Sequence, residues 1–165
     1  PHLTIKEQPH LPGRVGSAGF DGEGVATWAK NFVADGIVEN YVLSSYSGRK
    51  LEMPTTANAG GIFNLLVTGK AQPLAQVYKA MGTGLLVTEL MGQGVNSVTG
   101  DYSRGASGFW VENGEVTYPV DEITIASNLK DMYRDVVLLG DDVDERGNIR
   151  APSILVGAMT LAGSA

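Results

Sequence analysis

The sequence contains no cysteine. This absence excludes disulfide bonds and thiolate chemistry within the chain, and it gives no sign of a small secreted scaffold held together by disulfides. Histidine is scarce as well, because only His2 and His10 are present, both in the proline-containing opening segment. Neither histidine stands one helical turn from a second possible ligand, so the sequence predicts no zinc site and no other metal site in this chain.

Long apolar runs and clusters of basic residues are also missing. No stretch of about 18 apolar residues occurs and no basic-then-apolar leader opens the chain, so we expect neither a membrane span nor a signal peptide. The formal net charge is -6, and Arg49-Lys50 is the only basic pair. An acidic surface repels polyanions, which disfavours direct contact with nucleic acid. We therefore expect a soluble protein of the reducing cytoplasm.

Common catalytic and nucleotide-binding motifs are absent too. The segment Gly100 to Val120, GDYSRGASGFWVENGEVTYPV, has the glycines and hydroxyls of a phosphate loop, but it leads into a strand pattern and not into a helix N-terminus. Its Gly105 to Gly108 portion lacks the spacing of a G-x-S-x-G nucleophile elbow. The acidic run Asp141 to Arg146 lacks the alternating oxygens, central glycine and distal glutamate of a calcium loop, so we interpret it as a solvated loop.

Glycine, in contrast, is abundant, with 22 among 165 residues. The glycines stand between short apolar runs, as turn and bulge positions do in a β-rich domain. Two of them follow Asp or Asn between strand patterns, as Asp35-Gly36 and Asn113-Gly114. Such pairs supply the positive φ angles of a two-residue type I′ turn, so the sequence predicts two β-hairpins.

Two segments have helical periodicity. From Pro73 to Met81 the apolar residues fall on one helical face, and Gly82 is available to end the helix. A second apolar stripe runs from Leu129 to Val137, with Ser127 or Asn128 as the N-cap and Gly140 as the C-terminal stop. We expect both stripes to face the core.

The remaining apolar runs predict strands. Gly84 to Leu90 is almost continuously apolar, which suits a strand covered on both faces. Its Glu89 is either a polar group facing a groove or an exposed residue at the strand end, and we favour the second. Pro152 to Leu161 predicts a last pair of strands bent at Gly157. Taken together, the sequence predicts one α+β domain over residues 1–165, predominantly antiparallel β-sheet with two hairpins and two short helices.

Several longer segments carry a family resemblance. The runs Gly84 to Asp101, Tyr102 to Glu115 and Asn128 to Met132, preceded by Ser44 to Leu51 and Thr55 to Gly61, resemble the C-terminal domain of the PmbA (TldE) branch of the TldD/PmbA family. The resemblance implies a bacterial TldD-TldE metallopeptidase assembly that acts in proteolysis and peptide maturation, including removal of leader peptides. Members have also been named modulators of DNA gyrase. Since the chain starts at Pro1 without an initiating methionine, we expect it to be the C-terminal domain of a longer protein.

The catalytic residues of the family do not carry over to this chain. The resemblance implies a zinc site made of a HExxxH helix, which this sequence lacks, and a cysteine near the C-terminal end. The corresponding segment is Gly147 to Ser153, GNIRAPS, where Ala151 stands near the place of the thiolate. Alanine cannot bind a metal. The resemblance therefore implies a chain inactive by itself, without a cofactor of its own, and with zinc expected in a TldD-type partner.

The resemblance and the glycine-rich stretch together suggest a peptide-binding role. Small residues beside a strand let an extended peptide approach the backbone closely. We predict that Asp101, Ser103, Arg104 and Gly105, with Glu89, contribute to a substrate groove. The alternative is a glycine-bulged strand buried in the fold or at a subunit interface. The expected partners are a TldD-like subunit or a second copy of the chain, and a peptide substrate; the alternative function is a non-enzymatic module that regulates a partner such as DNA gyrase.

Overall fold

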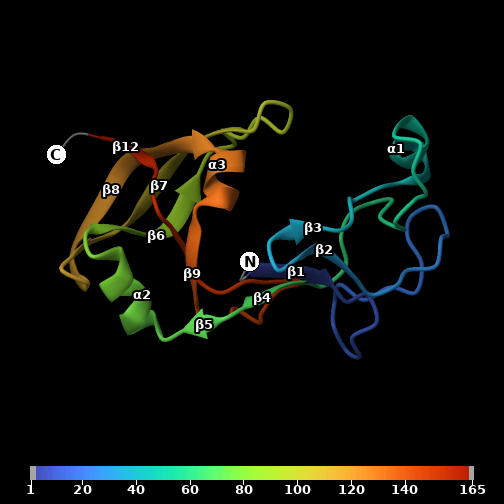
Figure 1. Cartoon of the computed structure of the whole chain (residues 1–165), viewed down its shortest axis with the longest axis horizontal. Coiled ribbons are helices and arrows are strands. Elements are labelled where there is room, and N and C mark those ends of the chain that lie inside the picture. The colour runs from blue at the N-terminus through green and yellow to red at the C-terminus, as the bar shows by residue number, and fades with distance from the viewer. Residues whose placement is uncertain (1–2, 164–165) are drawn as a thin grey trace. The chain divides into compact units, whose positions relative to one another are not determined.

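The computed structural model describes residues 3–163, which group into two compact units (Figure 1). Unit 1 comprises the chain up to residue 71 together with residues 142–152, and unit 2 comprises residues 72–141 and the chain from residue 153 onward. The single stretch of 165 residues predicted as one domain therefore contains two units. Each has its own sheet and its own buried residues.

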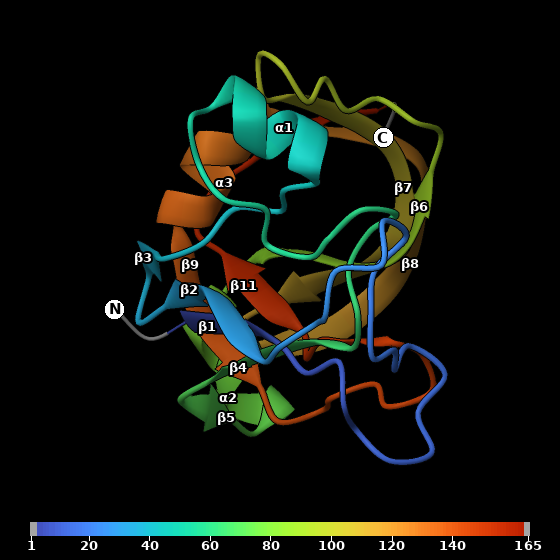
Figure 2. The ribbon, with the colours of Figure 1, turned by 90° about the vertical axis from the view of Figure 1, so that its right-hand side faces the viewer.

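Unit 1 is built on a five-stranded sheet with the order β10-β4-β1-β2-β3. Its strands are β1 (Leu3–Glu7), β2 (Lys30–Ala34), β3 (Ile37–Val38), β4 (Leu65–Gly69) and β10 (Ile149–Arg150). All neighbours are antiparallel except β10 and β4, which run parallel. In Figure 2, β1, β2 and β4 lie side by side, and long loops make up much of the rest of this unit.

Unit 2 contains a four-stranded antiparallel sheet with the order β12-β8-β7-β6. Its strands are β6 (Gly84–Met91), β7 (Asp101–Glu112), β8 (Glu115–Asn128) and β12 (Thr160–Ala162). A second, three-stranded sheet has the order β11-β9-β5. It consists of β5 (Ala71–Gln72), β9 (Val136–Gly140) and β11 (Ile154–Val156).

Both predicted hairpins are present. The turn between β2 and β3 has φ angles of 48° at Asp35 and 79° at Gly36, and the turn between β7 and β8 has 54° at Asn113 and 78° at Gly114. Two consecutive positive φ angles define the type I′ turn, whose twist matches that of the flanking strands. The prediction of an α+β fold dominated by antiparallel sheet is likewise confirmed by the pairing of the strands.

The helices are only partly as predicted. Helix α2 (Leu74–Met81) agrees with the prediction, buries Val77, and is followed by Gly82 at a φ of 67°. Helix α1 (Ser45–Lys50) was not predicted, although Ser44 and Ser47 form a capping box at its start. A six-residue helix is too short to produce a recognisable apolar stripe.

The second helix is shorter than predicted from the sequence. Asn128 caps helix α3 (Leu129–Arg134), as expected, because its side-chain oxygen accepts the Lys130 N–H. The helix stops at Arg134, with Asp135 as its C-cap. The following residues, up to Gly140, form strand β9 instead. Their run of valine and leucine suits a strand, and pairing with β11 decides the conformation. The predicted core stripe of this helix is also wrong, because α3 has no buried residue.

Two strand predictions need correction as well. The segment from Gly84 forms β6, but this strand lies at the edge of its sheet and is exposed from Thr88 onward, so it is not covered on both faces. The tail forms two strands separated at Gly157, as predicted, but they do not pair with each other. β11 joins β9 and β12 joins β8, in two different sheets.

Candidate functional site

The predicted groove residues of β7 lie in the middle of a sheet. Gly105 pairs with Met91 of β6 on one side and with Thr124 of β8 on the other. Further along, the Ser103 N–H donates to the Gly94 carbonyl at 2.7 Å, on the edge that β6 no longer covers. The backbone of this stretch is therefore already paired on both edges. A peptide cannot add to it as a strand and can reach it only through side chains.

The predicted side chains do not converge on one point. Strand alternation places Asp101, Ser103 and Gly105 on one face of β7 and Arg104 on the opposite face. Glu89 pairs with Ser107 and shares the first face. As contributors to a substrate groove these residues remain a prediction, and the structure divides them between two surfaces.

The contacts of Asp101 and Arg104, the two charged residues of β7 in the predicted groove, explain their local roles. Arg104 donates from Nη2 to the Leu90 carbonyl at 3.4 Å and from Nε to the Met91 carbonyl at 3.5 Å, where β6 ends. Asp101 accepts the Thr99 hydroxyl at 2.6 Å and the Asn128 amide at 3.4 Å. Both residues form hydrogen bonds at the ends of strands. Asp101 is exposed and Arg104 is half-buried.

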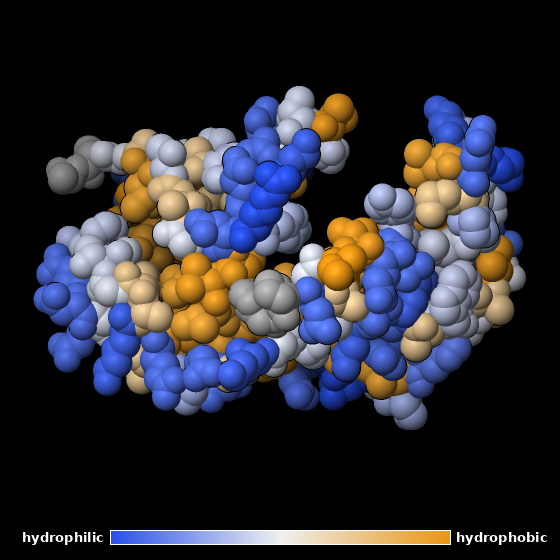
Figure 3. Space-filling model, viewed as in Figure 1, coloured by the Kyte–Doolittle hydropathy of each residue, from blue (hydrophilic) through white to orange (hydrophobic). Residues whose placement is uncertain are grey.

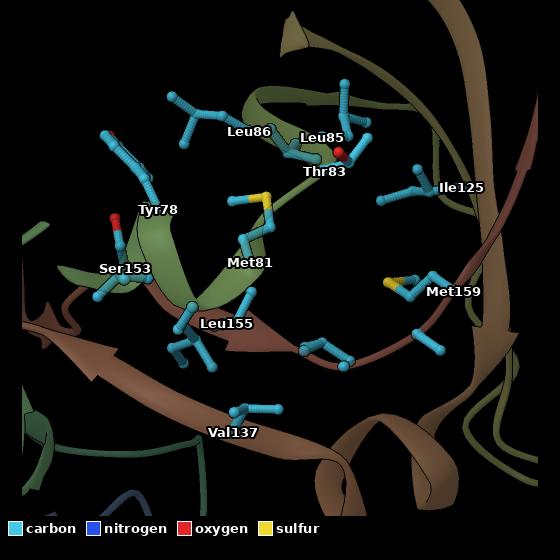
Figure 4. A pocket seen from close by; sticks show the side chains of 18 of the residues that line it. Tyr78, Met81, Thr83, Leu85, Leu86, Ile125, Val137, Ser153, Leu155 and Met159 are labelled. Atoms are coloured by element: carbon cyan, nitrogen blue, oxygen red, sulfur yellow. The ribbon is translucent and has the colours of Figure 1, made fainter. Parts of the chain in front are cut away.

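Unit 2 contains a pocket of about 560 Å³ (Figure 4). Helix α2, strands β6, β8 and β9, and the segment from Ser153 to Leu161 contribute to its walls. Met81 and Leu86 lie on one side of the view in Figure 4, and Ile125 and Met159 lie on another. Figure 3 shows apolar side chains at the surface of unit 2 near β9.

The chemistry of this pocket is uniform. No Asp, Glu, Lys, Arg or His is among its lining residues, and its polar side-chain groups are the hydroxyls of Tyr78, Thr83 and Ser153 and the indole N–H of Trp110. Val77 and Ile125, which are only 3% and 5% exposed, belong to its walls. Without a countercharge, an ionised group would lose its hydration with no compensation. The pocket therefore suits a neutral, apolar group.

A different kind of site occupies the interior of unit 1. The Glu7 carboxylate, which is 0% exposed, accepts the Lys30 ammonium, the Asn58 amide at 2.8 Å and the Phe63 N–H at 2.7 Å. The Lys30 Nζ lies 4.6 Å from the centroid of the Trp28 ring, within cation–π range. Every oxygen of Glu7 is thus engaged by groups of the chain. This cluster joins β1, β2 and two loops, and it offers no free group to a substrate.

This cluster is not among the sites predicted from the sequence. Its signal is visible afterwards in the strand patterns, because LTIKE and KNFVA place Glu7 and Lys30 opposite each other in adjacent strands. Opposite charges at directly paired positions indicate a cross-strand ion pair. The pattern does not reveal that the pair is buried.

A second buried carboxylate fixes the loops of unit 1. Burial of Asp21 raises its pKa, but the N–H groups of Ala59, Val25 and Glu23 bind the ionised form and hold the pKa below its usual value. The donor of Ala59 lies far along the chain from the other two. Asp21 therefore ties the loop after residue 20 to the segment around residue 59.

The acidic run from Asp141 to Arg146 is an exposed loop, as predicted. Within it the Arg146 guanidinium binds the Asp144 carboxylate, with Nη2 at 2.7 Å from Oδ2, and holds the pKa of Asp144 at about 2. The negative charge of Asp144 is therefore compensated by an arginine of the same loop. This arrangement agrees with a solvated loop.

Zinc does not fit the residues that the structure describes. Within residues 3–163, no three His, Cys, Asp or Glu side chains are grouped so that they could hold a metal ion. His10 contacts the Thr27 hydroxyl at 3.0 Å, and Ala151 offers no ligand atom. Next to it, Arg150 is buried and its Nε and Nη2 have no hydrogen-bond partner among the described residues. A buried cation at this place is the opposite of what a metal requires.

Among residues 3–163, no helix combines the length and the apolar character needed to cross a membrane. The longest, α2, has eight residues.

Comparison with known proteins adds the family. Residues 1–163 match the family described as the PmbA/TldA metallopeptidase C-terminal domain. The chain is 55% identical to the metalloprotease PmbA of Escherichia coli O157:H7 over 161 residues, which cover 98% of this chain and 36% of that protein. It is 53% identical to the metalloprotease PmbA homolog of Haemophilus influenzae, again over 98% of this chain and 36% of that protein.

Solved structures show the same fold. A protein of Thermotoga maritima named as a modulator of a DNA gyrase superposes with a TM-score of 0.86 at 36% identity, over 98% of this chain and 39% of that one. TldE from Thermococcus kodakarensis superposes with a TM-score of 0.79 at 22% identity, over 98% of this chain and 40% of that one, and shows the fold alone.

These matches define the class of protein as a metallopeptidase-family domain of two small α+β units. The chain belongs to the PmbA/TldD family and corresponds to its C-terminal domain. It spans little more than a third of the length of the curated relatives that it matches.

Proposed function

We propose that this chain is the C-terminal domain of a non-catalytic, PmbA/TldE-type subunit in a cytoplasmic peptidase assembly that trims peptides, including leader peptides. In this assembly the zinc is supplied by a TldD-type partner. The observation that supports the proposal is the combination of family membership with a donor set that does not fit zinc: no cysteine, Ala151 in the glycine-containing segment, and no group of ligands within residues 3–163.

In this role the chain binds and orients the peptide and leaves bond cleavage to the partner. The predicted groove has three charged groups: Asp101 and Glu89 lie on one face of the sheet, and Arg104 lies on the opposite face. An acidic domain also repels nucleic acid, so the proposed substrate is a peptide and not DNA.

Reconstitution tests this proposal. The chain is mixed with a TldD-type subunit, and cleavage of a leader-containing peptide is followed by mass spectrometry while zinc is measured in each separated subunit. We expect cleavage only in the mixture, with less than a stoichiometric amount of zinc in this chain. Peptide cleavage by the chain alone, or one tightly bound zinc per chain, would contradict the proposal.

Arg104→Glu tests the groove. We expect slower cleavage in the reconstituted pair, because the substitution reverses a charge at the end of β6. Lys130→Glu, on the exposed face of α3, makes the same charge change elsewhere and should leave cleavage unchanged. Since Arg104 also binds two carbonyls of the chain, circular dichroism and thermal unfolding must show that the fold of the variant is intact. Equal cleavage by a folded Arg104→Glu variant and the parent would assign the stretch to the scaffold.

The second candidate is a binding module that regulates DNA gyrase without proteolysis. It is favoured by the names of two proteins of similar structure, from Thermotoga maritima and Bacteroides thetaiotaomicron, each called a modulator of DNA gyrase. The net charge of -6 means that such regulation would act through protein contact and not through DNA. A change in gyrase supercoiling on addition of this chain alone, without any peptidase partner, would favour this function over the first.

A further inference from the structure

We propose that the free edge of β6 and the apolar pocket beside it together bind an extended peptide, with one bulky uncharged side chain of the peptide seated in the pocket. This inference rests on the proposed function, since it assumes that the substrate is a peptide. It moves the point of strand addition from β7 to β6.

The edge of β6 supplies the backbone part of the site. β6 is the last strand of its sheet, and within residues 3–163 only β7 pairs with it. Its outer N–H and C=O groups therefore have no ladder partner, which is the arrangement that strand addition uses. At the opposite edge of the sheet, β12 pairs with only three residues of β8, so Glu115 to Ile123 also have no outer strand partner among the described residues. None of these β8 residues lines the pocket, whereas Gly84 to Val87 of β6 do.

The pocket supplies the side-chain part. Residues Gly84 to Val87 of β6 themselves line it, so the edge strand and the pocket are continuous. In peptide recognition by strand addition, main-chain hydrogen bonds give affinity and adjacent pockets select alternate side chains. A volume of about 560 Å³ is ample for one aromatic or branched aliphatic side chain.

The composition of the walls determines which side chain fits. Met81, Ile125 and Met159 lie around the hollow in Figure 4, and no charged residue lines it. Methionine side chains adapt to differently shaped apolar groups and contact aromatic rings favourably. An aspartate or lysine would have to shed its hydration without a partner. The pocket therefore discriminates by polarity more than by shape.

Peptide binding by the 165-residue chain provides the first test. The probes are labelled octapeptides of serine, threonine and valine that differ only at one central position, and affinity is measured by fluorescence anisotropy. Burying a large apolar side chain is worth about 1.5–3 kcal/mol, so phenylalanine or leucine at that position should bind about tenfold to a hundredfold more tightly than aspartate or lysine. Equal affinities, or no binding of any probe, would overturn the inference.

Variants that fill the pocket test whether it selects the side chain of the peptide. Ala158→Trp and Ala80→Trp each add a large side chain at a lining position, on the tail and on α2 respectively, and should abolish the preference for phenylalanine. Ala75→Trp makes the same change at an exposed position of α2 outside the pocket and should keep it. Two lining positions on different elements ensure that one misfolded variant does not decide the result. If filling the pocket changes only self-association, measured by sedimentation, the occupant is a second copy and the inference fails.

Backbone methylation tests strand addition itself. A strand presents alternate N–H groups to each edge, so N-methylation at every second residue of the probe blocks one edge and spares the other. We expect one methylation pattern to abolish binding and the shifted pattern to preserve it. Equal loss or equal retention with both patterns would exclude pairing along β6.

Cleavage in the reconstituted pair separates this inference from the proposed function. If the pair cleaves peptides but Ala158→Trp and Ala80→Trp keep the parent's preference, the inference fails and the proposed function stands. If the chain selects apolar peptides but no TldD-type subunit cleaves them, the proposed function fails and the binding site stands.

Discussion

The two units of this chain differ in the kinds of side chain that they bury. All buried polar side chains of residues 3–163 belong to unit 1, among them Glu7, Asp21, Lys30 and Asn64, whereas the buried side chains of unit 2 are apolar, such as Val111 and Leu139. Unit 1 has short strands and long loops, and its buried polar groups bind loop backbone. Unit 2 has strands of 12 and 14 residues, β7 and β8, which pair with each other through their backbone hydrogen bonds.

This difference teaches how each unit specifies its structure. Loops cannot pair their backbone groups in a ladder, so unit 1 uses buried carboxylates and amides as acceptors and donors in place of a neighbouring strand. Such interactions are directional, and an unpaired member is costly. Unit 2 relies on ladders and close backbone contacts. The first unit should therefore be sensitive to lost partners and the second to added volume.

The largest expected effect is the loss of one partner of the buried ion pair. Lys30→Met leaves the Glu7 carboxylate in the interior without its cation, and breaking such a pair typically costs about 3–5 kcal/mol of unfolding free energy. Urea unfolding followed by fluorescence measures this cost.

The double variant Glu7→Gln with Lys30→Met is the control for the same pair. It removes both charges and should recover much of the lost stability, because no unpaired charge remains. If the double variant were as unstable as Lys30→Met, the charges would not be the reason.

A smaller effect is expected from added volume in unit 2. A Cβ at Gly108 would lie 1.9 Å from the Leu86 carbonyl oxygen, so Gly108→Ala must push β6 away from β7. We expect a loss of about 2–3 kcal/mol, in the range of overpacked interiors. Gly19→Ala, where nothing lies within 4 Å of the added atom, is the control and should be close to neutral in urea unfolding. Equal effects of the two substitutions would contradict the assignment of a shape constraint to β6 and β7.

The smallest expected effect concerns pH and unit 1. Since the pKa of Asp21 is lower in the folded chain than in the unfolded one, the ionised carboxylate stabilises the fold above about pH 4, and this contribution is lost as the pH falls through the lower folded pKa. Asp21→Asn should therefore flatten the dependence of the urea midpoint on pH below about pH 4. An unchanged slope in the variant would show that Asp21 does not carry this linkage.

The sequence predicts the features that local chemistry decides. Asn113-Gly114 defines its turn because few residues accept two positive φ angles, and α2 follows from its apolar periodicity. Strand β9 was mistaken for helix because valine and leucine at positions 136–139 fit both periods, and only the pairing with β11 decides between them. Tertiary partners are not visible in a local pattern.

The candidate site shows the same division. The resemblance indicated the family and the absence of the family's zinc ligands from this chain. The net charge of -6 disfavours DNA as a partner, which stays a prediction. The position of Arg104 on the face opposite Glu89 depends on the register of β6 against β7, which the residues do not reveal in advance. The pocket was missed because its walls come from α2, β6 and the tail, which meet only in the folded chain.

The path of the chain between its units has a consequence for synthesis and engineering. The chain passes from one unit to the other after residues 71, 141 and 152, and β10 joins β4 only after nearly all of unit 2 has been made. During translation, the sheet of unit 1 therefore waits for its last strand until the ribosome has passed residue 150. No single cut in the gene yields either unit intact, so a truncation that keeps one unit whole must also keep part of the other.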